Sequence, residues 1–229
     1  MRDTITWRSR LGAVLGSLAL GLGATSALAA PPAAPGPAGA QGPATPFYEG
    51  AYVMGSPKAR IVVAEYASVV CPHCARFDAA VFPAIKARYI DTGKIRFEFR
   101  EYLTEPAEVA ASAFIIARCA GKAAYFKTVE EIFRAQPEMF SGRAGAAPVD
   151  VLMRIAKDNG VDAARFQACL ADKAAVTALQ ARIDHAIEVD NVAGTPTVLI
   201  NGRKVEPDAP EWTADRLSAV IDAALKTGR

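Results

Sequence analysis

The hydrophobic and polar positions of the chain predict two early strands. Residues 61–66 (IVVAEY) form a short β-branched apolar run, which is typical of a buried strand. Residues 95–102 (IRFEFREY) alternate apolar and charged side chains, which predicts a strand with one buried and one exposed face. Between these runs, the fourfold spacing of apolar residues predicts one helical face that continues to Thr92–Gly93. The residues on that face are Phe77, Val81, Ile85 and Tyr89. Pro83 should kink the helix because it lacks a backbone N–H.

The middle of the chain, residues 106–190, is rich in Ala, Lys, Glu and Arg and predicts a block of helices. The expected helices span residues 106–120, 122–135, 148–159, 162–170 and 173–189. Asn159–Gly160 is typical of a helix end and Asp162 of a helix start.

Strand chemistry returns after this block. Residues 197–200 (TVLI) predict a strand, Asn201–Gly202 a hairpin turn, and residues 203–205 the returning strand. An amphipathic helix should follow over about residues 213–225. The order of elements predicts an α/β fold with an inserted all-helical domain.

The N-terminus has the pattern of an export signal. Three arginines precede an apolar run from Leu11 to about Leu28, and the small residues around Ala29 predict cleavage after residue 29. The alternative is an uncleaved membrane anchor, since no charge occurs between Arg10 and Glu49. Either route exports the rest of the chain to an oxidising compartment. Residues 30–46, composed almost entirely of Ala, Pro and Gly, should form an extended linker.

The amino-acid composition excludes several classes of protein. The 229 residues are 52% hydrophobic and 22% charged, which excludes a disordered protein. The net charge is only +2, and loss of residues 1–29 would balance the basic and acidic residues. This balance predicts no nucleic-acid partner. Four cysteines are too few for a disulfide-held scaffold of this length.

Cys71-Pro72-His73-Cys74 carries the sharpest chemical signal. The motif follows a strand and opens a helix, where unpaired N–H groups and the helix dipole stabilise a thiolate on Cys71. His73 could add a hydrogen bond or a positive charge. The pattern therefore predicts a redox-active disulfide in which Cys71 is attacked by substrate and the less exposed Cys74 resolves the mixed disulfide. The alternatives are an inert disulfide or a zinc site, but the second ligand pair of a structural zinc site is missing, and we expect no metal and no cofactor beyond the disulfide.

Two further positions could serve this site. A cis bond at Thr195–Pro196 would bring the Thr195 backbone to the cysteines, where it could pair with an extended substrate segment. Glu65 interrupts an apolar run, so burial should raise its pKa and allow it to relay a proton for Cys74. The alternative for Glu65 is an ion pair with Arg96 or Arg100.

Residues 65–74 (EYASVVCPHC), 81–89 (VFPAIKARY) and 194–202 (GTPTVLING) together resemble the DsbA-like thiol–disulfide oxidoreductases of the bacterial periplasm. The resemblance spans roughly residues 47–229. It implies a thioredoxin-like fold over residues 47–105 and 190–229, interrupted by a helical domain over residues 106–189. It also implies site roles for Cys71 as nucleophile, Cys74 as resolver, His73 as thiolate stabiliser, Pro196 as a cis residue and Glu65 as the buried acid.

Two features lie outside the best-known pattern of that family. Thr195 replaces the valine of the best-known DsbA, and a threonine there can hydrogen-bond a cysteine sulfur and shift its potential. Cys119 and Cys169 have a spacing that resembles the second disulfide of some DsbA-like proteins. In an oxidising compartment a structural disulfide is favoured over two buried free thiols.

The resemblance implies a periplasmic oxidase that gives its disulfide to unfolded or newly exported cysteine-containing proteins. A quinone-linked membrane partner of the DsbB type would reoxidise it. The alternatives are a reductase or isomerase on the same fold, or a holdase-like chaperone. Because residues 30–46 are too short for the dimerisation domain that such isomerases need, we expect a monomeric oxidase.

Overall fold

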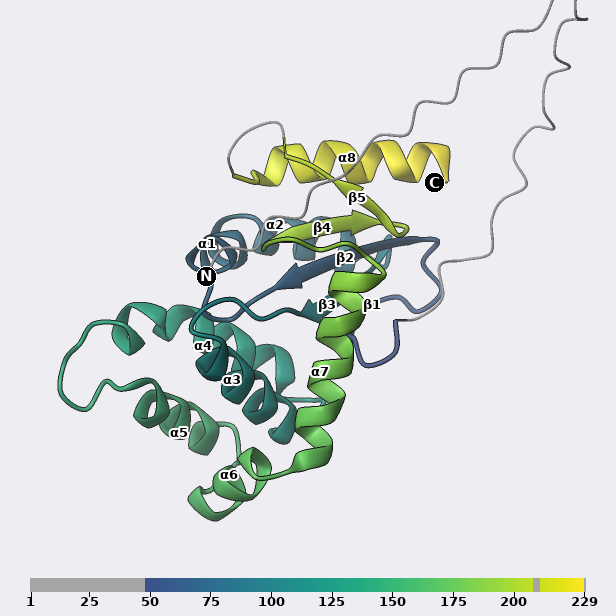
Figure 1. Cartoon of the computed structure of the whole chain (residues 1–229). Helices are drawn as coiled ribbons and strands as arrows, with labels where there is room; N and C mark the ends of the chain where they lie inside the picture. Colours follow the sequence, from purple (N-terminus) through teal and green to yellow (C-terminus); the bar gives the residue numbers. More distant parts are fainter. Residues whose placement is uncertain (1–47, 208–210, 229) are drawn as a thin grey trace, which may run out of the picture. The chain divides into compact units, whose positions relative to one another are not determined.

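The computed structural model describes residues 48–207 and 211–228, which form a five-stranded sheet and its flanking helices (Figure 1). The predicted signal peptide and linker lie outside the described residues. The sheet has the strand order β1-β3-β2-β4-β5, in which β2 and β3 are parallel and the other pairs are antiparallel. The strands are β1 (Tyr52–Gly55), β2 (Ile61–Ala67), β3 (Ile95–Glu101), β4 (Thr197–Ile200) and β5 (Arg203–Val205). The short strand β1 was not among the expected elements.

Helices cover both faces of the sheet (Figure 1). Helix α1 (Pro72–Ala80), α2 (Phe82–Ile85) and the π-helical turn η1 (Lys86–Ile90) lie with α8 (Ala214–Thr227). The hydroxyl of Tyr89 donates to Asp222 over 2.9 Å and joins η1 to α8. On the opposite face, Ala186 of α7 (Lys173–Glu188) packs with Ala64 and Tyr66 of β2. Successive side chains of a strand point to opposite faces of the sheet. Because helices cover both faces, β2 is buried along its whole length.

The helix after the cysteine motif breaks where proline chemistry requires it. Helix α1 ends at Ala80, and Val81 leaves ideal helical geometry with φ −109°, two residues before Pro83. The four apolar residues that predicted the buried face are all buried. The kink and the face follow directly from the sequence.

The predicted helical block is present between β3 and β4. It contains α3 (Ala107–Cys119), α4 (Tyr125–Met139), α5 (Pro148–Asp158), α6 (Ala163–Leu170) and α7. Together with the sheet it confirms the predicted α/β fold with a helical insertion. Helix α4 differs from expectation because it continues through Pro137 rather than ending at residue 135. Its last turn is closed by the bond from the Phe140 N–H to the Gln136 carbonyl, 3.1 Å long.

The prediction that β3 is only half buried was wrong. All seven of its residues are buried, including Arg96, Glu98 and Arg100. The Glu98 carboxylate accepts hydrogen bonds from both guanidinium groups, at 3.1 Å from Arg96 and 2.7 Å from Arg100. Buried charges persist when they are paired in this way, so an alternating pattern does not require an exposed face.

No helix within residues 48–207 and 211–228 is both long enough and apolar enough to span a bilayer.

Candidate active site

Cys71 caps the N-terminus of α1. It has extended backbone angles, and Pro72 occupies the first helical position, where a missing N–H costs nothing. The Cys71 N–H donates to Ser68, and its carbonyl accepts the first helical bond from Ala75 at 3.1 Å. The sulfur-bearing residue is therefore fixed at the positive end of the helix dipole, as the sequence predicted.

The fold brings Thr195 to this cysteine across 124 positions of sequence. The Cys71 sulfur lies 3.5 Å from the Thr195 carbonyl oxygen. The Thr195–Pro196 peptide bond is cis, in agreement with the expectation from the resemblance. The Thr195 hydroxyl is buried, and its side chain lies close enough to the cysteines to lower the pKa of Cys71. Both the backbone and the side chain of Thr195 therefore face the chemistry at Cys71.

The two cysteines, which are free thiols in the structure, have opposite acidities. Hydrogen bonding from the Cys74 thiol is the largest effect on Cys71, and it combines with bonds from Thr195 and the backbone of Cys74 and His73 to lower its pKa to about 5. Cys74 is fully buried, and burial together with the neighbouring Cys71 and Glu65 raises its pKa well above the ordinary value. At neutral pH the site therefore pairs a Cys71 thiolate with a Cys74 thiol.

Glu65 is buried close to both cysteines. Burial raises the pKa of its carboxyl well above the ordinary value, and the nearby charges of Asp78 and Cys71 raise it further. Arg96 and Arg100, the alternative partners considered for Glu65, both pair with Glu98 instead. Sequence reasoning missed Asp78, whose pKa burial raises to about 6. Its position one helical turn after Cys74 was the available signal.

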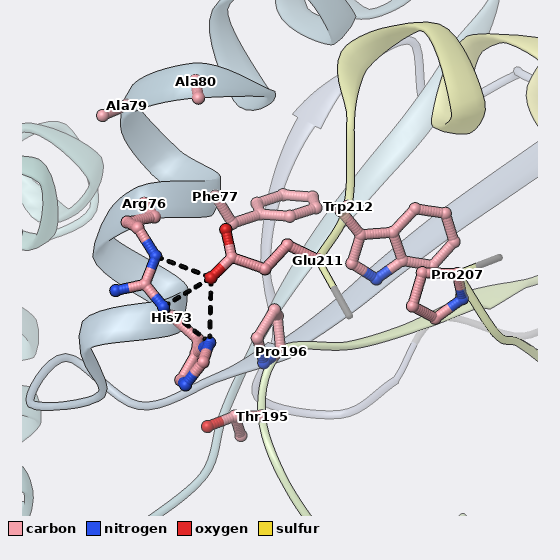
Figure 2. A pocket seen from close by; sticks show the side chains of 10 residues that line it. All are labelled: His73, Arg76, Phe77, Ala79, Ala80, Thr195, Pro196, Pro207, Glu211 and Trp212. Atoms are coloured by element: carbon pink, nitrogen blue, oxygen red, sulfur yellow. Dashed lines mark hydrogen bonds and ion pairs between the residues drawn. The ribbon is translucent and has the colours of Figure 1, made fainter. Parts of the chain in front are cut away.

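His73 lies on the exposed side of the motif, in contact with Arg76 and Glu211 (Figure 2). Its Nδ1 atom is 2.8 Å from Arg76 Nη2 and 3.4 Å from the Glu211 carboxylate. Arg76 also donates two hydrogen bonds to Glu211, at 2.6 and 2.9 Å. The cluster joins α1 to the segment before α8.

A groove of about 440 Å³ opens beside this cluster. Figure 2 shows that the rings of Phe77, Pro196, Pro207 and Trp212 contribute to its lining. The groove therefore offers an apolar surface with a charged rim directly next to Thr195 and the cysteine motif. A partly unfolded polypeptide carries both kinds of group.

The helical insertion supplies a residue that sequence reasoning missed. Gln136 of α4 is buried, and its side-chain amide donates to the carbonyls of Val69 and Cys71, at 2.8 and 3.1 Å. The expected helix ended at residue 135, so Gln136 fell outside any predicted element. No sequence signal connects it to the cysteine motif.

The other two cysteines form a disulfide. Cys119 at the end of α3 and Cys169 in α6 are bonded, with their Cα atoms 6.3 Å apart. In the part of the chain that the structure describes, no cluster of three or more His, Cys, Asp or Glu side chains could hold a metal ion.

Comparisons with known proteins agree with this fold. The family model described as Thioredoxin matches residues 48–223. A putative protein-disulfide oxidoreductase of Rickettsia bellii is 31% identical over 77% of this chain and 65% of its own length. The chain thus spans less than two thirds of the length of this and similar Rickettsia relatives.

Among solved structures, alpha-DsbA1 of Wolbachia pipientis matches with a TM-score of 0.69 and 25% identity, over 80% of this chain and 94% of that one. BdbD of Bacillus subtilis, at 22% identity and a TM-score of 0.67, shares the fold over 80% of this chain and 96% of its own.

The sheet, the cysteine pair at the start of α1 and the helices between β3 and β4 are those of a thioredoxin-like fold with a helical insertion. The chain belongs to the thioredoxin family. Within that family it is similar to protein-disulfide oxidoreductases and to the DsbA protein of Wolbachia pipientis.

Proposed function

We propose that this protein is an exported thiol–disulfide oxidoreductase that introduces disulfide bonds into other exported proteins. The observation that carries the proposal is the unequal acidity of Cys71 and Cys74. Because the folded protein stabilises a Cys71 thiolate, it stabilises the reduced form of the pair. A pair whose reduced form is stabilised is a strong oxidant.

The reaction follows from this arrangement. A substrate thiolate attacks the Cys71 sulfur of the Cys71–Cys74 disulfide and forms a mixed disulfide, while Cys74 leaves and takes up a proton. Glu65 is the group beside Cys74 that would supply this proton. The second substrate thiolate then attacks the substrate sulfur that is bonded to Cys71, forms the substrate disulfide and releases Cys71 as a thiolate. The substrate loses two electrons and the enzyme gains them. When the second thiol is absent, Cys74 attacks instead and frees the substrate.

The remaining site residues would position the substrate. The Thr195 carbonyl, 3.5 Å from the Cys71 sulfur, would pair with an extended segment around the substrate cysteine, next to Pro196. The groove lined by Phe77 and Trp212 would hold neighbouring apolar side chains. Pro72 would shape the first helical turn, and the backbone N–H of His73 would stabilise the thiolate, while its side chain contacts Arg76 and Glu211.

Turnover in this direction needs an electron acceptor. We infer a quinone-linked membrane partner of the DsbB type and a periplasmic location for a monomeric enzyme. The export pattern at the N-terminus supports the location, and the need to remove two electrons from the enzyme after each turnover supports the partner.

The reduction potential tests the direction of electron flow. Equilibration with glutathione, read by thiol alkylation, should give a value near the roughly −120 mV of strong periplasmic oxidants. A value near about −270 mV would contradict the oxidase proposal and indicate a reductase. A Cys119→Ala/Cys169→Ala variant measured alongside shows whether the second disulfide tunes the site.

Replacing Cys71 separates catalysis from binding. Cys71→Ser should abolish the oxidation of a reduced, unfolded substrate protein. The result would instead indicate a holdase if the unsubstituted protein showed no oxidase activity and Cys71→Ser still suppressed the aggregation of the substrate.

A further inference from the structure

The contact between Gln136 and the cysteine loop joins two parts of the fold that are separate in sequence. Helix α4 lies against α1 (Figure 1), and the Gln136 amide reaches across to the loop that precedes α1. Both of its bonds are to backbone carbonyls, of Val69 and Cys71, and the side chain is only 7% exposed. A buried amide that donates both of its protons to one loop holds that loop in a single conformation.

The electrostatic consequence concerns the thiolate. Carbonyl oxygens carry partial negative charge, and those of Val69 and Cys71 belong to the loop that carries the sulfur. Hydrogen bonds to these oxygens reduce their negative potential, and in a buried region this reduction is poorly screened by water. The bonds also fix the backbone of Cys71, so that its sulfur faces the N–H groups of the first helical turn.

We propose that Gln136 is a positioning residue for the redox reaction, through which the helical insertion stabilises the Cys71 thiolate and raises the oxidising power of the disulfide. This inference rests on the proposed function and assigns a part of that function to α4. The lowered pKa of Cys71 agrees with it. The other groups that stabilise the thiolate are the Cys74 thiol, the Thr195 side chain and the backbone of His73, all of which belong to the thioredoxin-like part. Gln136 adds a contribution from the helical insertion.

Gln136→Met tests the proposal, because methionine has a similar length and no N–H donor. The pH dependence of iodoacetamide alkylation gives the pKa of Cys71, and equilibration with glutathione gives the equilibrium constant. We expect the acid dissociation constant of Cys71 to fall roughly three- to tenfold, the effect of losing about one hydrogen bond. The equilibrium should shift toward the disulfide by a similar factor.

Two control variants separate positioning from stability. Ile132→Val trims a fully buried side chain of the same helix without removing a donor, so it should lower the melting temperature and leave both redox readouts unchanged. Gln167→Met makes the same chemical change on an exposed position of α6 and should change neither. If Gln136→Met behaves like Ile132→Val, with lower stability and unchanged Cys71 acidity, the proposal is overturned.

A measurement on the unsubstituted protein covers the case in which Gln136→Met does not fold. In an NMR spectrum of the reduced protein, the side-chain N–H signals of Gln136 should shift with pH. The midpoint of this shift should equal the midpoint of the pH titration of the Cys71 thiolate absorbance. Signals that do not follow that titration would refute the proposal. If these signals did not titrate but Cys71→Ser still lost oxidase activity, the role of Gln136 would be refuted and the proposed function would stand. A failure of this inference is therefore distinguishable from a failure of the proposed function.

Discussion

Glu65 shows how the tertiary environment changes a single side chain. A carboxyl in a strand of apolar residues is expected to be buried, and the structure places it close to Cys71 without a basic partner among the described residues. Its pKa is therefore raised, and the folded protein holds a proton that the unfolded chain releases.

This proton predicts a pH-dependent gain in stability for Glu65→Gln. Above the ordinary pKa of about 4.5, the unfolded chain binds fewer protons than the folded one, so stability falls as pH rises toward the folded pKa. Glutamine does not titrate, so the variant should exceed the parent by at least about 1 kcal/mol at pH 8, and by less at pH 4. Thermal unfolding of the oxidised protein, in which neither active-site cysteine titrates, measures the difference.

Glu188→Gln is the matched control, because Glu188 is exposed on α7. It should show little change with pH. A Glu65→Gln difference that stays flat between pH 4 and pH 8 would contradict the raised pKa.

At the scale of elements, β3 and α7 are joined by charge as well as by apolar packing. Glu98 pairs with Arg96 and Arg100 along β3, and Arg100 also donates to Asp190 over 2.7 Å, just after α7. The hydroxyl of Tyr66 donates to the same carboxylate at 2.6 Å. This network anchors the segment that leads from α7 to Thr195.

Glu98→Gln should therefore destabilise the protein strongly. It removes the negative charge between two buried guanidinium groups, and breaking a buried ion pair from one side costs about 3–5 kcal/mol. Urea unfolding measures the change. Glu130→Gln, which breaks an exposed pair with Arg134 on α4, should cost under about 0.5 kcal/mol. Similar losses in the two variants would show that the Glu98 network contributes little to stability.

The Cys119–Cys169 disulfide joins two helices of the insertion. It closes a loop of 50 residues, and the chain-entropy model assigns such a cross-link about 4 kcal/mol. Cys119→Ala/Cys169→Ala should lower the free energy of unfolding by that order, measured by urea titration with the active-site pair oxidised in both proteins. A loss below about 1 kcal/mol would mean that the unfolded chain is already constrained without the disulfide.

For the whole molecule, the redox state of one site should set the global stability. The thiolate of reduced Cys71 is favoured in the fold, with a pKa of about 5 against an ordinary value of 9.0. This stabilisation is present above the unfolded pKa and is lost as pH falls through about 5. Cys74 does not offset it near neutral pH, because its pKa is raised and it stays protonated.

The reduced protein should thus unfold at higher urea concentration than the oxidised protein at pH 7, and the advantage should shrink toward pH 5. The Cys119→Ala/Cys169→Ala background keeps a reductant from breaking the second disulfide during the measurement. A more stable oxidised form at pH 7 would contradict the proposed direction of electron flow.

Features that depend on neighbours along the chain could be predicted from the amino-acid sequence. Apolar spacing located the buried face of α1 and η1, Asn201–Gly202 marked the turn between β4 and β5, and the CPHC motif predicted the redox chemistry that we propose. These features were predictable because helix periodicity, turn conformation and N-terminal helix electrostatics act over a few residues.

The contacts between distant groups, and the burial of charged side chains, became visible in the folded protein alone. Thr195 approaches Cys71, and Gln136 bonds the cysteine loop, from parts of the chain that lie far away in sequence. Glu98 pairs with Arg96 and Arg100 within β3, and this pairing buries charges that the alternating pattern had placed on an exposed face. Such contacts depend on how the helices pack against the sheet and on where burial requires charges to pair. A local pattern holds no information about either.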